Sequence, residues 1–139
     1  MKGAAPRTRR RRQDRQLGWI VVGAVVGGAL GLWVGPILLV ETVMLLGPAH
    51  VLLGRVLGLA LYEAGTWAPA VLVSLGLARL RWLRTAPARL AVLVGPLALE
   101  LLLVGMVGTL PAAYTSWPAA LARAAGLAMS GVLVWRLTP

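Results

Sequence analysis

The sequence predicts an all-α integral membrane protein, a four-helix bundle made of two helical hairpins. Of its 139 residues 59% are hydrophobic and 13% are charged, and the mean hydropathy is +0.83. A soluble domain of this size carries about 25% charged residues. The apolar residues form runs long enough to cross a bilayer, and the basic residues form clusters that fall between these runs.

The chain begins with a basic tail, residues 1–16, which we expect to be disordered because it lacks apolar periodicity. The apolar run that follows is far longer than the 7–15-residue core of a signal peptide, so we expect it to be retained. The first crossing is predicted over residues 17–46, with a kink at Pro36. As a helix it would be about 45 Å long, which exceeds the roughly 30 Å hydrocarbon core. Gly47-Pro48 ends it.

Three further crossings are predicted. The second covers residues 67–83 and has a helical extension over 49–64, which either continues the crossing or bends near Gly65 to Pro69. The third covers residues 88–108 and the fourth residues 119–135. Breaks near Glu41 and Glu63 would give a five-helix alternative.

The positive-inside rule favours four crossings, because four place the tail and the second basic cluster on one side. We therefore expect a multi-pass inner-membrane protein with both termini in the cytoplasm. The basic residues predicted to set this topology and to meet anionic lipid headgroups are Arg9, Arg10, Arg11, Arg12, Arg79, Arg81, Arg84 and Arg89. The tail has no interleaved aromatic residues, so nucleic-acid binding is not expected. The excess of Arg over Lys fits a GC-rich bacterial genome.

Four glycines at a spacing of four form a groove on the first helix: Gly23, Gly27, Gly31 and Gly35. This pattern resembles the glycine zippers of many unrelated membrane proteins, in which small residues let two helices approach closely. Two interpretations stay open. The groove receives another helix of the same chain, or it receives a partner protein or a second copy.

Six polar or charged residues fall in or beside apolar segments and are predicted to gather in the outer half of the bilayer. They are Glu41, His50, Arg55, Glu63, Glu100 and Arg123. One interpretation is structural ion pairs, Glu100 with Arg123 and Arg55 with Glu41 or Glu63. The other is a polar cavity in which a carboxylate exchanges protons or binds a cation. One histidine with two distant acids is a weak metal signal, so no metal site is predicted.

No catalytic pattern is present in the sequence, so we predict no enzyme and no cofactor. There is no cysteine, and the single histidine excludes paired-histidine haem ligation. The leading hypothesis is a small membrane protein that acts through helix packing, as an accessory or assembly subunit or as a homo-oligomer. The alternative is a component of a proton, cation or small-solute transporter or channel that uses its intramembrane glutamates.

Overall fold

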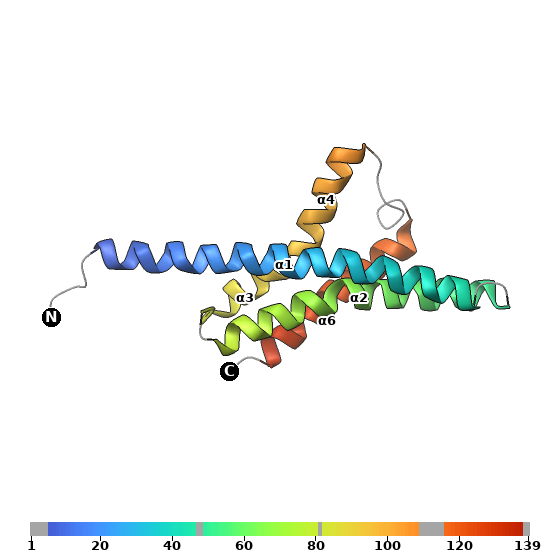
Figure 1. Cartoon of the computed structure of the whole chain (residues 1–139). Coiled ribbons are helices and arrows are strands. Elements are labelled where there is room, and N and C mark those ends of the chain that lie inside the picture. Colours follow the sequence, from blue (N-terminus) through green and yellow to red (C-terminus); the bar gives the residue numbers. More distant parts are fainter. Residues whose placement is uncertain (1–5, 47–48, 81, 109–115, 138–139) are drawn as a thin grey trace.

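The computed structural model describes residues 6–46, 49–80, 82–108 and 116–137, with side chains from residue 10 onward. The helices in these ranges are α1 (Pro6–Leu46), α2 (Val51–Arg79), α3 (Ala86–Val92), α4 (Gly95–Val107) and α6 (Trp117–Arg136) (Figure 1). No described residue belongs to a β-strand. The all-α prediction is confirmed.

Four helical segments are long and apolar enough to cross a membrane. They are α1 from Arg10, α2, the α3–α4 pair and α6. The turn after α2 lies at the same end of the molecule as the start of α1 and the end of α6, and the end of α1 and the start of α2 lie at the opposite end (Figure 1). We call these the basic end and the hairpin end. The length and apolar composition of these four segments confirm the prediction of a multi-pass membrane protein.

Helix α1 starts at Pro6, whereas disorder was expected over residues 1–16; residues 1–5 lie outside the described residues. Proline suits the first turn of a helix, and Arg and Gln are good helix formers. An apolar helix that is already formed extends into such a segment at little cost, because nucleation is the unfavourable step. The described arginines of the tail therefore lie along a helix.

Two internal prolines leave their helices unbroken. Pro36 lies within α1 and Pro69 within α2. The extension expected over residues 49–64, which would continue the second crossing or bend from it, is helical from Val51 and belongs to one helix with that crossing. A proline inside a helix costs about 3 kcal/mol, and α1 packs closely against α2 on both sides of the two prolines.

The glycine face of α1 makes this packing. A Cβ atom added to Gly27 would lie 2.9 Å from the Cα of Ala70, and one at Gly23 would lie 2.7 Å from Leu77 Cδ1. Gly31 and Gly35 lie against Thr66 so closely that a side chain at either would overlap it. The groove therefore receives α2 of the same chain, as in the first of the two interpretations.

The third crossing, expected as one span over residues 88–108, is divided into α3 and α4. The N–H groups of Leu93 and Val94 bond three residues back, to Leu90 and Ala91, so the α-helical pattern stops there. Gly95 then lies against the backbone of Ala24, a contact that only a glycine permits. Past Glu100, the second half of α4 runs away from the other helices (Figure 1), and Gly105 has no neighbouring atom where a side chain would be.

The fourth crossing, expected over 119–135, is α6. It packs against α2, and its buried Val134 joins Ala70, Val71 and Leu93 in a small apolar core at the basic end. Much of the remaining apolar surface is exposed. In a chain of this hydropathy that surface is suited to lipid.

Candidate functional site: a buried cluster of two glutamates and one arginine

Three charged side chains from three helices meet inside the bundle. Glu63 comes from α2, Glu100 from α4 and Arg123 from α6, and each is at most 5% exposed. We call them the buried charge cluster. Each residue lies on the inward face of its helix, so the cluster joins helices that are far apart in the sequence.

Arg123 is the centre of the cluster. Its Nη1 lies 3.2 Å from Glu63 Oε2 and 3.4 Å from Glu63 Oε1, and it donates hydrogen bonds to both oxygens. Its Nη2 forms an ion pair with Glu100 Oε2. One guanidinium group is therefore shared by two carboxylates, and it connects α6 to α2 and to α4 at the same time.

Two aromatic residues of α2 complete the surroundings of the carboxylates. The Tyr62 hydroxyl donates a hydrogen bond to Glu100 Oε1 at 3.1 Å, and the Trp67 indole N–H donates one to Glu63 Oε2 at 3.0 Å. Both rings also flank the guanidinium of Arg123, with centroids 5.6 and 5.5 Å from its Cζ. At this range an aromatic face attracts a cation.

A glycine allows α6 to come this close. A Cβ atom on Gly126 would lie 2.6 Å from Trp67 Cδ1, so a larger residue would push the two helices apart. Gly126 follows Arg123 by three residues and lies on the same face of α6. The close packing of Gly126 against the Trp67 side chain and the ion pairs of Arg123 therefore support each other.

The formal charges of the cluster do not balance. Two carboxylates and one guanidinium leave one negative charge when all three are ionised. Burial of charged groups costs several kcal/mol per ion, and here one guanidinium is shared between two carboxylates. The cluster can join three helices, and it holds two acids close together inside the bundle.

The structure separates the six residues that were predicted to gather together. The predicted pair of Glu100 with Arg123 is present, and Glu63 joins it. The predicted pairing of Arg55 with Glu41 or Glu63 does not occur among the described residues. Glu41, His50 and Arg55 are exposed near the hairpin end. No group of three His, Cys, Asp or Glu side chains in the described part of the chain is placed to hold a metal ion.

Tyr62 and Trp67 were missed in the sequence, although a signal was present. Tyr62 directly precedes an intramembrane acid, and Trp67 follows that acid by four residues, which places it on the same face of a helix. Both side chains are hydrogen-bond donors with a large apolar surface. Trp67, one turn after Glu63, is a natural partner for that carboxylate, whereas Tyr62 faces away from Glu63 and bonds Glu100 of another helix.

The predicted headgroup residues have different surroundings. Arg10, Arg11, Arg12, Arg79 and Arg84 are exposed; Arg81 and the side chain of Arg9 lie outside the described residues. Arg89 is buried instead. It donates hydrogen bonds to the carbonyls of Leu83 and Arg84 at 3.1 and 3.0 Å, and its own carbonyl accepts one from Ser74. Arg89 therefore holds the turn after α2.

No protein family, curated protein or solved structure that was compared with the chain matches it.

Proposed function

We propose that this chain is a small, non-enzymatic, polytopic inner-membrane protein with both termini in the cytoplasm. It acts through helix packing, as an accessory or assembly subunit of a membrane complex or as a homo-oligomer. The observation that carries the proposal is the course of α4, whose second half lies apart from the other helices of its own chain (Figure 1).

The second half of α4 offers an apolar surface to its surroundings. Met106 is 84% exposed and Leu102 is 63% exposed, and Gly105 leaves a gap between them. Helices in lipid attract each other through close packing, which small residues such as glycine favour. A helix of a second copy or of another subunit is the kind of partner that this surface fits.

The glycine groove of α1 does not serve this purpose, because α2 fills it. Substitution of Gly27 or Gly31 by Leu would place a side chain in the backbone of α2. Such variants would lose the fold of the α1–α2 hairpin, and they would not report on association with a partner.

Cysteine cross-linking tests the proposal, since the chain contains no cysteine of its own. Leu102→Cys and Met106→Cys are compared with Leu72→Cys, which is 69% exposed on α2. After reconstitution and oxidation, we expect a disulfide dimer from the α4 positions and none from the α2 position. For a heteromeric complex, a photo-reactive residue at 106 in native membranes gives one discrete adduct. Absence of both products, with the protein folded, contradicts the proposal.

Transport of protons or cations is the second candidate, and the presence of two carboxylates beside one guanidinium inside the bundle favours it. Flux into proteoliposomes is measured for the parent, Glu63→Gln and Glu100→Gln, with Glu41→Gln as the matched control on an exposed acid. Transport through the cluster requires that the first two variants lose flux and the control keeps it. No flux in the parent removes this candidate.

A further inference from the structure

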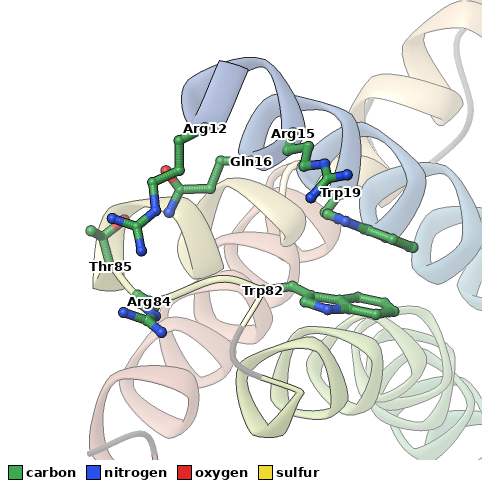
Figure 2. A pocket seen from close by; sticks show the side chains of 7 residues that line it. All are labelled: Arg12, Arg15, Gln16, Trp19, Trp82, Arg84 and Thr85. Atoms are coloured by element: carbon green, nitrogen blue, oxygen red, sulfur yellow. The ribbon is translucent and has the colours of Figure 1, made fainter. Parts of the chain in front are cut away.

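A cavity of about 690 Å³ lies at the basic end, away from the buried charge cluster. It is formed between the start of α1 and the turn after α2 (Figure 2). This volume is in the range of pockets that hold small organic ligands. Unlike the apolar faces of the bundle, its walls carry concentrated positive charge.

Three guanidinium groups line the cavity, from Arg12 and Arg15 of α1 and from Arg84 in the turn after α2. None of the described lining residues is acidic, and none of the ion pairs in the described part of the chain involves these arginines. Guanidinium groups that line one cavity repel one another, and an anion bound between them relieves this repulsion. They also present paired N–H donors, which match the oxygens of a phosphate group.

The arrangement of these side chains follows from the helix and from the turn. Arg12, Gln16 and Trp19 are spaced four and three residues apart and therefore share one face of α1. The side chains of Arg12 and Gln16 extend toward Arg84 and Thr85 (Figure 2). Arg89 holds the backbone of Arg84 by a hydrogen bond of 3.0 Å, so the opposite wall of the cavity is fixed as well.

Two uncharged hydrogen-bond donors lie beside the arginines of the cavity. Thr85 precedes the first residue of α3, but its hydroxyl makes no capping hydrogen bond there. The hydroxyl of Thr85 and the amide of Gln16 both line the cavity. A hydroxyl and an amide N–H beside three guanidinium groups give a set of donors suited to an oxyanion.

The depth of the cavity identifies the source of the anion. Trp19 and Trp82 stack on each other at its inner side, with ring centroids 3.8 Å apart and an angle of 20° between the rings. Tryptophan is enriched where the hydrocarbon meets the headgroups. Arg15 and Arg12 lie one and two turns before Trp19, about 6 and 10 Å farther along the helix axis. If the tryptophan pair marks the edge of the hydrocarbon core, this distance places the guanidinium groups level with lipid phosphates.

We propose that this cavity binds the phosphate headgroup of an anionic phospholipid from the leaflet at the basic end. Arg12 and Arg84 bind the phosphate, and Arg15, which extends toward Trp19 (Figure 2), adds a third positive charge. Gln16 and Thr85 donate to the phosphate oxygens or to the polar headgroup, and the Trp19–Trp82 pair contacts the glycerol and the first acyl carbons. This is a discrete site for one lipid, and it differs from general adhesion of a basic tail to an anionic surface.

Native mass spectrometry of the full-length protein in a neutral detergent tests the site. The delipidated protein is titrated with phosphatidylglycerol and, separately, with phosphatidylcholine. We expect one phosphatidylglycerol to bind at least tenfold more tightly than phosphatidylcholine. The double variant Arg12→Gln/Arg15→Gln should weaken this first binding event by about 30-fold, at roughly fivefold for each basic residue lost. Arg84→Gln, on the opposite wall, should weaken it by about fivefold.

The matched control is Arg10→Gln/Arg11→Gln, which removes the same charge from the same helical segment at positions that do not line the cavity. Its first binding event should be unchanged. Equal losses in the two double variants, or equal binding of the two lipids, overturn the proposal. Inorganic phosphate distinguishes a free anion from a headgroup. If it displaces phosphatidylglycerol at comparable concentration, the lipid assignment is wrong; we expect no displacement.

Discussion

The charged residues in the apolar part of this chain fall into two groups with opposite surroundings. Glu63, Glu100 and Arg123 are buried between three helices and bonded to one another. Glu41 and Arg55 are exposed, and no ion pair joins either of them to a described residue. The comparison shows that the charged residues buried between helices are the ones that have charged partners, whereas the exposed ones have none among the described residues.

Depth gives the physical reason. If the hydrocarbon core starts near the Trp19–Trp82 pair, a span of about 20 residues takes α1 to the far side near residue 40. Glu41 and Arg55 then lie at the edge of the core, where a charged side chain reaches headgroups or water at little cost. Glu63 and Glu100 lie deeper, where only another protein group can compensate their charge.

Of the substitutions that test this comparison, loss of Arg123, the cation shared by the two carboxylates, should lower the stability most. Arg123→Gln leaves two buried carboxylates without their counter-charge, and removal of one partner from a buried ion pair costs about 3–5 kcal/mol. We expect the free energy of unfolding in mixed micelles to fall by that amount. A loss below about 1 kcal/mol would mean that the cluster does not hold α2, α4 and α6 together.

Replacement of Glu63 or Glu100 alone should destabilise the protein much less than replacement of both. Glu63→Gln or Glu100→Gln alone leaves one carboxylate for one guanidinium, so each loss should stay near 1 kcal/mol, the net value of a typical hydrogen bond. The double variant leaves Arg123 unpaired and should cost as much as Arg123→Gln. Denaturant titration of the three variants checks this. Simple additivity of the two singles would argue against a shared cation.

A smaller loss is expected from the hydrogen-bond donors around the carboxylates. Tyr62→Phe removes the hydroxyl that donates to Glu100 and keeps the ring that flanks Arg123. The unfolding free energy should fall by about 1 kcal/mol. The same measurement on Tyr62→Phe in the Glu100→Gln background should give a smaller loss, because the acceptor is then uncharged.

Substitution of the exposed residues Glu41 and Arg55 should change the stability least. Glu41→Gln and Arg55→Gln should each leave the unfolding free energy within about 0.5 kcal/mol of the parent, as for other substitutions at unburied positions. A loss of 2 kcal/mol from either would show that the two groups do not differ as described.

Much of the fold was predictable because hydropathy and basic clusters report directly on membrane crossings. The pairing of Glu100 with Arg123 was predictable too, since a short connection brings the third and fourth crossings together. The participation of Glu63 was not. Its depth depends on where α2 begins, and residues 49–64 contain no signal that separates an interfacial extension from a continuous helix.

The tripeptide Val-Gly-Pro occurs at residues 34–36 and 94–96, and its two copies show a second limit of prediction from the sequence. Residues 34–36 stay within α1, whereas residues 94–96 mark the break between α3 and α4. The tripeptides are identical, so the difference comes from their neighbours. Gly35 lies against Thr66 of a helix that runs beside it, and Gly95 lies against Ala24, where the chain turns away from α1. Packing of this kind is a tertiary property that local sequence does not encode.

The most direct test of the central claim, that Arg123 joins α2, α4 and α6 through two carboxylates, is a comparison of two variants. The unfolding free energy is measured for Arg123→Gln and for the neutral triple variant Arg123→Gln/Glu63→Gln/Glu100→Gln. The account predicts that the triple variant recovers most of the stability lost by the single one, because no buried charge remains unpaired. A triple variant less stable than Arg123→Gln would contradict it.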